Sequence, residues 1–400
     1  MLSIKTRQFI ERHIDGNPAL LRLSAKPEEG LDIAFAVEQI AIRQQLRDKL
    51  PDWAVNFGLV FPSRISGEQS SSELTARYKQ RFFSGGNLMD LTGGLGVDFF
   101  YMSQVAETAV YIDKKEENSN VIRHNLATLG RKNAEVESGD SIALLSAWSR
   151  PLDLIYVDPS RRDGNNKRTY GLSDCEPDVV AHKSLFFEKA KRVLIKASPM
   201  VDVKQMLVSY PEATEAHIVS VRNECKEVLL FADTGQQIRE ATIFCVNLSP
   251  EKEEAFSFSF SFSFSEEEAA TAFYAAPQAY LYEPSASVLK GGAFKSVSQR
   301  YGLKKLGRHS HLYTSAELCE AFPGRIFEKE EVFPFNNRLK KELSTIVPKA
   351  NISVRNFPLS VAEIRKQTKI KEGGDVYLFA TSLESGEKIV IKAKKIDSCR

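Results

Sequence analysis

Cysteine is scarce in this sequence, and long hydrophobic runs are missing. The 400 residues include five cysteines, an odd number without a C-x-x-C pair, which argues against a disulfide framework and a zinc knuckle. No stretch approaches the roughly 18 uninterrupted apolar residues of a membrane helix, and the charged start does not resemble a signal peptide. No spacing of histidines with cysteines or carboxylates indicates a metal site. We therefore expect a cytoplasmic protein without a bound metal or a membrane partner.

Excess charge is also small over the chain as a whole, but it is unevenly distributed. The formal net charge is +2, too small for a protein that binds nucleic acid through bulk charge. Residues 333–400 contain 14 Lys and Arg against 7 Asp and Glu, whereas the residues before them contain 40 against 45. Any basic surface is therefore expected mainly in the last sixth of the chain.

Apolar patterning divides the chain into four parts and predicts an α/β protein. Residues 1–85 show helical spacing and predict a helical N-terminal domain. In residues 86–250, short apolar runs alternate with helical stretches, which predicts a mainly parallel sheet with an antiparallel hairpin at its edge. Residues 251–332 predict a linking α+β segment. Residues 333–400 predict a small α+β domain of their own.

Seven strands are predicted in residues 86–250, each bounded by a turn or a helical pattern: Leu88–Asp90, Ala109–Asp113, Glu135–Ser138, Leu152–Val157, Arg192–Lys196, Glu215–Val221 and Val228–Ala232. A further strand is predicted at 256–264, where FSFSFSFSF has a period of two and places five Phe on one face. Because an exposed strand of this kind would aggregate, we expect it to be buried against helices.

A glycine-rich loop, within MDLTGGLGVD at 89–98, follows the first predicted strand. Glycines allow a tight turn and close approach to a ligand, and the helix that follows begins with unpaired N–H groups. Acidic residues stand at the ends of the later strands: Asp113, Asp140 and Asp158. Because the carboxyl ends of parallel strands share one edge, these three side chains and Asp90 are predicted to face one cleft.

This set resembles the class I S-adenosylmethionine-dependent methyltransferases, which implies a Rossmann-like core and S-adenosylmethionine as cofactor. On that resemblance, the methionine part would be held by the loop residues Asp90, Thr92, Gly93, Gly94, Leu95 and Gly96. Asp113 would hold the ribose, Asp140 the adenine amino group, and Asp158 the region next to the reacting methyl group. Thr92 stands where the family usually has glycine.

The sequence Asp158-Pro159-Ser160-Arg161-Arg162 stands where amino-group methyltransferases have D/N-P-P-Y/F. There, a carboxylate and a carbonyl accept hydrogen bonds from the target NH2 group and direct its lone pair toward the methyl group. The stacking aromatic residue is replaced, but an arginine can also stack on a base or hold a phosphate. We therefore expect Asp158, Pro159 and Arg161 to act at a base amino group.

A ribose hydroxyl is the alternative acceptor. Asp158, Lys196 and either Glu224 or Glu227 follow the order of the Lys-Asp-Lys-Glu set of ribose 2′-O-methyltransferases, in which a lysine of lowered pKa deprotonates the hydroxyl. The first lysine would be Lys79, for which the sequence gives no placement. The sequence is also compatible with a cofactor-binding scaffold without transfer activity and with an enzyme that methylates a non-RNA substrate.

The end of the chain, NISVRNFPLSVAEIRKQTKIKEGGDVYLFATS, resembles the THUMP-like domain of a group of bacterial methyltransferases. With DLTGGLGVD, DPSRRDG, LIKASPM and RNECKE, the resemblance covers nearly the whole chain and implies a ferredoxin-like segment at 251–332. It also implies a transfer or ribosomal RNA substrate. Phosphate contacts are expected from basic residues that follow Pro159 in the core and from basic residues of the C-terminal domain. They are Arg161, Arg162, Arg355, Arg365, Lys366, Lys369 and Lys371. We also expect the loop at 69–72 to close over the cofactor.

Overall fold

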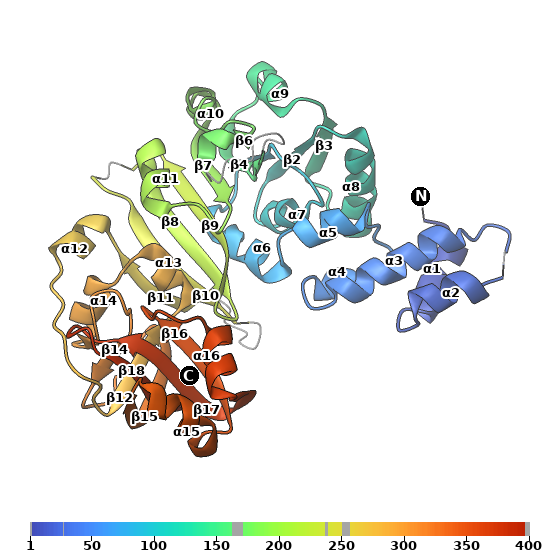
Figure 1. Cartoon of the computed structure of the whole chain (residues 1–400). Helices are drawn as coiled ribbons and strands as arrows, with labels where there is room; N and C mark the ends of the chain where they lie inside the picture. Colours follow the sequence, from blue (N-terminus) through green and yellow to red (C-terminus); the bar gives the residue numbers. More distant parts are fainter. Residues whose placement is uncertain (1, 27, 162–170, 237–238, 250–256, 397–400) are drawn as a thin grey trace. The chain divides into compact units, whose positions relative to one another are not determined.

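The computed structural model describes residues 2–26, 28–161, 171–236, 239–249 and 257–396 (Figure 1). The chain forms two compact units. The first contains residues 1–216, 226–241 and 248–256, and the second contains residues 217–225, 242–247 and 257–400. None of the helices in the described residues combines the length and the apolar character needed to cross a membrane.

The first unit begins with helices, as the sequence predicts. Their bounds are α1 Ile4–Arg12, α2 Pro18–Ser24, α3 Ile33–Leu46, α4 Pro51–Val55, α5 Arg64–Gln69 and α6 Glu73–Lys79. Polar side chains cap most of their starts: Ser72, for example, accepts a hydrogen bond from the Thr75 amide. Buried Arg43 joins α3 to the following turns by donating to the carbonyls of Trp53, Ala54 and Leu59.

A nine-stranded sheet follows, in the order β11-β10-β8-β9-β7-β4-β1-β2-β3. The strands are β1 Asn87–Asp90, β2 Thr108–Asp113, β3 Ala134–Ser138, β4 Leu152–Val157, β7 Ala190–Ala197, β8 Ala213–Val221, β9 Glu224–Asp233, β10 Thr242–Leu248 and β11 Ser257–Phe262. Strands β3, β2, β1, β4 and β7 are parallel, and β9 is antiparallel to β7. The predicted α/β fold with a mainly parallel sheet is therefore confirmed.

Helices and a small two-stranded sheet lie between these strands in the chain. The helices are α7 Val97–Ser103, α8 Glu116–Thr128, α9 Ser141–Ala147, α10 Lys183–Lys189 and α11 Val203–Ser209. The two short strands β5 Ser160–Arg161 and β6 Cys175–Glu176 pair with each other after β4. Both β1 and β4 are central, so their apolar side chains are buried, among them Leu88, Met89 and Ile155.

The predicted hairpin is formed by β8 and β9. Its two-residue connection, Arg222-Asn223, has φ of 50° and 60°, the backbone region of a tight hairpin turn. The prediction placed this hairpin at the sheet edge. That position is wrong, because β10 and β11 continue the sheet beyond β8. Strand β10 was not predicted.

The Phe-Ser repeat forms β11 but ends earlier than the sequence pattern suggests. Phe260 and Phe262 are buried, and Gly291 of α13 (Ala286–Gly291) packs closely on Phe262. Burial of the repeat against a helix is therefore confirmed for these two side chains. Ser263 and Glu266 form a capping box that starts α12 (Phe264–Ala269), so the strand stops at Phe262. Phe256 lies outside the described residues.

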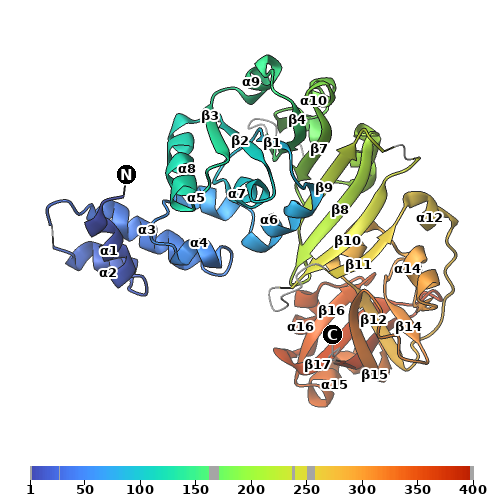
Figure 2. The same ribbon diagram turned by 180° about the vertical axis from the view of Figure 1, so that it is seen from behind.

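The rest of the second unit is a seven-stranded sheet with helices, in the order β13-β14-β12-β15-β18-β17-β16. Its strands are β12 Tyr280–Pro284, β13 Lys304–Lys305, β14 Tyr313–Ser315, β15 Gly324–Pro334, β16 Lys349–Arg355, β17 Lys371–Ser382 and β18 Lys388–Lys395. Besides α12 and α13, its helices are α14 Lys295–Arg300, α15 Asn337–Ile346 and α16 Val361–Thr368. Figure 2 shows α15 and α16 beside β16 and β17.

Apolar clusters cover the sheet of the second unit on two faces. Leu343 of α15 and Ile364 of α16 pack with Leu378 of β17. On the other face, Leu306 and Leu312 pack with alternate residues of β17 and β18. Because successive strand residues point to opposite faces, these two clusters account for the alternating apolar pattern of the last two strands.

Candidate active site

The glycine loop connects β1 to α7 and needs its glycines for two physical reasons. The φ angles of Gly93, Gly94 and Gly96 are +29°, +63° and +75°, which side chains with a Cβ rarely adopt. A Cβ on Gly93 would also lie only 2.7 Å from the Ile112 carbonyl oxygen and would overlap the Tyr111 ring. The Tyr111 hydroxyl donates to the Gly94 carbonyl at 2.7 Å and thereby holds the loop against β2.

Asp90 lies beneath the start of this loop and is only 2% exposed. Its Oδ1 accepts hydrogen bonds from the Thr92 amide at 2.9 Å and from the Thr92 hydroxyl at 3.2 Å. Burial raises the pKa of Asp90 to about 7. Thr92 Oγ1 also accepts a hydrogen bond from the Asp158 amide at 2.6 Å. Thr92, the departure from the family pattern, therefore joins the ends of β1 and β4.

Asp113 and Asp140 follow β2 and β3 and accept backbone hydrogen bonds. Asp113 Oδ2 accepts from the Gly94 amide at 3.0 Å, and its Oδ1 accepts from the Lys115 amide at 2.7 Å. Asp140 caps α9 through the Ala143 amide at 2.9 Å. Asp113 is therefore held by the glycine loop and by the turn after β2, and Asp140 is held by the start of α9.

A cavity of about 520 Å³ opens along this edge of the sheet. Its lining comprises Leu91, Thr92, Asp113, Lys114, Gly139, Asp140, Ser141, Ile142, Asp158, Ser160, Glu176, Pro177, Asp178 and His182. The structure therefore brings four of the predicted residues together: Thr92, Asp113, Asp140 and Asp158. Asp90, Pro159, Lys196 and the residues from Gly93 to Gly96 lie near these in the chain or the sheet but do not line the cavity.

One wall of the cavity was missed in the sequence. Glu176, Pro177, Asp178 and His182 come from β6 and the turn before α10. The sequence C-E-P-D carries a turn signal but no pattern that indicates a ligand. The pairing of β5 with β6 and an ion pair between Glu176 and Lys114 at 3.0 Å hold this segment at the strand ends.

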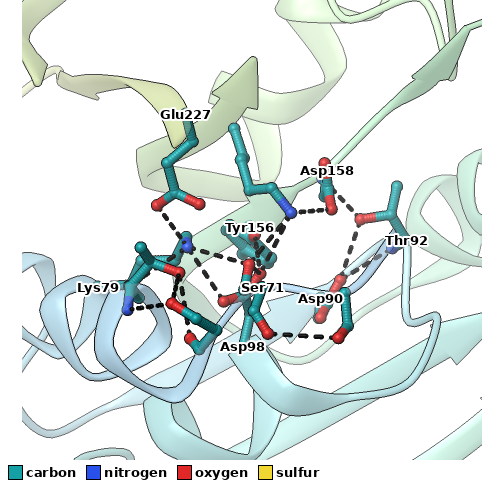
Figure 3. A network of polar contacts seen from close by, with 12 residues as sticks. Ser71, Lys79, Asp90, Thr92, Asp98, Tyr156, Asp158 and Glu227 are labelled. Atoms are coloured by element: carbon teal, nitrogen blue, oxygen red, sulfur yellow. Dashed lines mark hydrogen bonds and ion pairs between the residues drawn. The ribbon is translucent and has the colours of Figure 1, made fainter. Parts of the chain in front are cut away.

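A buried ion cluster lies beside Asp158 (Figure 3). Lys79 of α6 contacts Asp98 of α7 at 3.1 Å and Glu227 of β9 at 2.6 Å. Lys196 of β7 pairs with Asp158 and lies 3.6 Å from Asp98. Lys79 is fully buried, and the side chains of Asp98 and Lys196 are only 10% and 12% exposed. The structure thus places Lys79, for which the sequence offered no position, next to the other members of the Lys-Asp-Lys-Glu set.

Two hydroxyl groups complete the cluster and were not predicted to belong to it. Ser71 Oγ and the Tyr156 hydroxyl each donate to Asp98 Oδ2 at 2.7 Å. Ser71 Oγ also accepts from Lys79 at 3.3 Å and from Lys196 at 3.2 Å. Asp98 follows the last glycine of the loop by two residues, which was the one sequence signal for it.

Neighbouring groups stabilise the ionised forms of Lys196 and Asp98, whereas burial raises the pKa of Glu227. Burial opposes the charge on Lys196, but Asp158, Asp98 and Glu227 together raise its pKa above the ordinary lysine value. Burial also opposes the charge on Asp98, but Lys79 and Lys196, with the two hydroxyl donors, lower its pKa. Lys196 is therefore a cation in this arrangement.

The predicted phosphate-binding residues fall into three groups. Arg355 pairs with buried Glu283 at 3.0 Å, and Arg365 donates to the carbonyls of Ile370 and Ala350, so both have partners within the domain. Lys366, Lys369 and Lys371 are exposed around the end of α16. Arg162 and the side chain of Arg161 lie outside the described part of the chain.

Metal ligands are not grouped in the described ranges. There, no set of three or more His, Cys, Asp or Glu side chains is arranged to hold a metal ion.

Comparisons with known proteins agree with this geometry. Residues 280–323 match a ferredoxin-like domain family, and residues 324–395 match a THUMP domain-like family. A crystal structure from Porphyromonas gingivalis W83, provisionally described as a methyltransferase, is 35% identical and covers 98% of both chains with a TM-score of 0.88. Uncharacterized S-adenosylmethionine-dependent methyltransferases of two Mycobacterium tuberculosis strains are 22% identical over 359 residues, which cover 88% of this chain and 93% of theirs.

The residues at the strand ends fit the cofactor that these relatives use. The cavity has a volume typical of small-molecule sites, and the glycine loop leaves open space at Gly94, where a Cβ would meet only the Thr92 carbonyl oxygen, at 3.8 Å. Carboxylates that can accept hydrogen bonds from hydroxyl and amino groups of the cofactor line the same edge of the sheet. The chain is an enzyme that belongs to the class I S-adenosylmethionine-dependent methyltransferases with a C-terminal THUMP-like domain.

Proposed function

We propose that the protein transfers a methyl group from S-adenosylmethionine to a nucleotide of structured RNA, transfer or ribosomal, and that Asp158 presents the acceptor. One observation carries this proposal: Asp158 lines the cavity with Thr92 and Asp113 and also pairs with the buried Lys196. It is therefore the carboxylate that borders both the cofactor side and the ion cluster.

The cofactor would be held by the residues that line the strand ends. Asp113 would accept hydrogen bonds from the ribose hydroxyls, and Asp140 would accept one from the adenine amino group. The glycine loop would surround the methionine part. A cationic amino group near Asp90 would lower the pKa of this buried carboxyl and favour its ionised form. When bound, S-adenosylmethionine supplies a methyl group on a positively charged sulfur.

A base amino group is the acceptor that this arrangement favours. Asp158 and the Pro159 carbonyl oxygen would accept hydrogen bonds from the amino group and so orient its lone pair. Lys196 holds one oxygen of Asp158, which restricts the carboxylate to one orientation. No neutral lysine is required for these roles.

An RNA substrate is supported by the C-terminal domain. Residues 324–395 match a THUMP domain-like family, and Lys366, Lys369 and Lys371 are exposed there. Such lysines can contact phosphates without reading sequence, which suits a domain that orients the substrate while the core transfers the methyl group.

A ribose 2′-hydroxyl is the second candidate, because Lys79, Asp158, Lys196 and Glu227 lie together in the structure. In that reaction Lys196 would have to lose its proton before it could accept one from the hydroxyl. Asp98, a third carboxylate at this point, raises the pKa of Lys196 and opposes that loss. The base amino group is therefore the first proposal and the ribose hydroxyl the second.

The test is transfer of labelled methyl from S-adenosylmethionine into total RNA from a strain that lacks this gene. We expect label in one RNA size class with the unmodified protein and at least a hundredfold less with Asp158→Ala, since oriented hydrogen-bonding groups of this kind contribute about that much. Asp202→Ala, which removes an exposed cap of α11, is the matched control and should leave the transfer unchanged.

Nucleoside analysis of the labelled RNA then separates the two acceptors. An N-methylated base supports the first proposal, and a 2′-O-methylated ribose supports the second. If cofactor binds but no RNA is labelled, the RNA proposal is wrong, and protein or small-molecule substrates should be tested.

A further inference from the structure

We propose that Asp98 is a positioning residue for methyl transfer: it holds Lys196 in place beside Asp158 and joins the loop at 70–72 to the same cluster. The inference rests on the proposed function in one respect, that Asp158 presents the acceptor. The contacts themselves are independent of the identity of the substrate.

Asp98 lies between the glycine loop and Lys196, the partner of Asp158. It is buried in the first turn of α7, two residues after the glycine loop, so it moves with the backbone that would surround the cofactor. Its two oxygens face Lys79 at 3.1 Å and Lys196 at 3.6 Å. Lys196 in turn pairs with Asp158. A displacement of α7 would therefore be transmitted to Asp158 through the Asp98–Lys196 and Lys196–Asp158 ion pairs.

The hydrogen bonds on Asp98 Oδ2 determine its orientation. Ser71 and Tyr156 both donate to this oxygen at 2.7 Å, one from the loop between α5 and α6 and the other from β4. Groups that donate to a carboxylate from two directions leave it a single preferred rotamer. Asp98 is thus held independently of Lys196 and can serve as a fixed anchor for it.

Lys79 balances the charge that this anchor introduces. Without it, Asp98 and Glu227 would be two buried carboxylates near a single Lys196. Lys79 contacts both and favours their ionised forms, although burial still raises the pKa of Glu227. The three carboxylates near Lys196, those of Asp158, Asp98 and Glu227, raise its pKa and keep it charged.

Ser71 connects the loop to the cluster. Only 7% of its surface is exposed, and its hydroxyl contacts Asp98, Lys79 and Lys196. Lys49, a further cation near Lys196, holds the end of α5 by donating to the Gly67 and Glu68 carbonyls. The expected closure of this loop over the cofactor would therefore be coupled to the position of Lys196.

The first experiment compares Asp98→Asn with the unmodified protein over a range of pH. The charged groups that face Lys196 are Asp98 of α7, Asp158 after β4, Glu227 of β9, Lys79 of α6 and Lys49 after α3. Loss of one carboxylate lowers the pKa of Lys196. We therefore expect turnover to fall about a hundredfold, since a small misplacement of reacting groups can cause a loss of this size. On the alkaline side of the pH profile, turnover should be lost at a lower pH than in the unmodified protein. The lysine side-chain NMR titration should show the same shift without any substrate.

Opposite results would overturn the proposal. If Lys196 acts as a base, lowering its pKa should raise turnover near neutral pH. If Asp98 is only structural, turnover should fall by the same factor at every pH, even though removal of its charge lowers the pKa of Lys196.

A milder variant covers the case in which Asp98→Asn does not fold. Ser71→Ala should lower turnover about tenfold, the effect of one or two hydrogen bonds to charged groups, with little change in the KM for RNA. Ser103→Ala is the matched control, because this buried serine of α7 donates only to the Phe100 carbonyl in its own helix. Equal effects of the two variants would contradict the role of Ser71.

The two proposals can fail separately. If no RNA is methylated, the proposed substrate is wrong, yet the Lys196 titration in Asp98→Asn still tests the cluster. If RNA is methylated but neither variant alters the pH profile or the Lys196 titration, Asp98 has no positioning role.

Discussion

Each unit contains a buried carboxylate held by two cations, and the choice of cation differs. In the first unit, Asp98 faces Lys79 and Lys196. In the second, Glu283 of β12 is 1% exposed and pairs with Arg325 of β15 and Arg355 of β16. The lysine cluster borders the cavity at the strand ends through Asp158, whereas the arginine cluster joins strands within a sheet.

This difference follows from the chemistry of the two cations. Arginine stays charged under all ordinary conditions and binds a carboxylate with two parallel N–H groups, which suits a permanent link between strands. Lysine is a point charge whose pKa responds to its neighbours, which suits a position beside a reacting group. Buried charge in the second unit is therefore expected to serve stability, and in the first to serve turnover.

Removal of the Glu283 charge should have the largest effect on stability. Glu283→Gln leaves two arginines without their partner, and we expect a loss on the order of 3 kcal/mol, with a smaller loss if the arginines, about one-third exposed, are solvated instead. Chemical denaturation measures this loss. Glu328→Gln, an exposed glutamate of β15, is the matched control. If Glu283→Gln lowered turnover without lowering stability, the contrast drawn between the buried carboxylates of the two units would be wrong.

Asp90 is the reverse case, because ionisation of its carboxyl lowers the stability of the folded protein and is expected to support cofactor binding. The folded protein holds the Asp90 proton up to about pH 7, whereas the unfolded chain releases it near pH 4, so the cofactor-free protein loses stability as the pH rises through this interval. Asp90→Asn should therefore raise Tm above pH 7.

The same substitution should weaken cofactor binding. The amide can still accept from Thr92, but the charge is lost, and we expect affinity for S-adenosylmethionine to fall about tenfold or more. Calorimetric binding and thermal unfolding at two pH values measure the two effects. Unchanged Tm and unchanged affinity would show that Asp90 is not an ionisable part of the site.

The exposed lysines should affect RNA binding but not stability. Replacement of Lys366, Lys369 and Lys371 by Gln should reduce the dependence of RNA affinity on salt by about two to three phosphate contacts. Binding measured at several salt concentrations tests this. Equal salt dependence in both proteins would place the phosphate contacts elsewhere on the chain.

The smallest effect is expected for Tyr156→Phe. It removes one of the two hydroxyl donors on Asp98 and leaves Ser71 in place. We expect a few-fold lower turnover, since a hydrogen bond to a charged group contributes about 1.5 to 3 kcal/mol and Ser71 retains part of it. Steady-state kinetics and Tm together measure the change. A fall in Tm without a kinetic change would assign Tyr156 to stability alone.

The strand ends were predictable because local pattern determines them. β4 has the predicted bounds, Leu152–Val157, and β1 and β2 extend the predicted ones by one residue each. The parallel order of such strands then places Asp113 and Asp158 on one edge by a general rule. These positions required no knowledge of tertiary contacts.

The ion cluster was predictable only in part: the sequence grouped Asp158, Lys196 and Glu224 or Glu227, but it gave no place for Lys79 and did not indicate Asp98 as a member. Lys79 and Asp98 meet because α6 packs on α7, and Glu227 joins them from β9. These contacts depend on how separate elements pack, which no spacing in the sequence reveals. The start of α10 also depends on a local contact: the Asp178 carboxylate accepts from the Val180 and Ala181 amides and forms a turn, so the helix starts only at Lys183.

Thr92 has a consequence for motion. The Asp158 amide donates to the hydroxyl of Thr92 in the glycine loop, so exchange of this amide with deuterated solvent requires the contact to open. Any ligand that orders the loop should therefore slow exchange at Asp158, before any acceptor has arrived. A glycine at position 92, as is usual in the family, would remove this contact and leave the strand ends joined by backbone hydrogen bonds such as that from the Leu91 amide to the Tyr156 carbonyl.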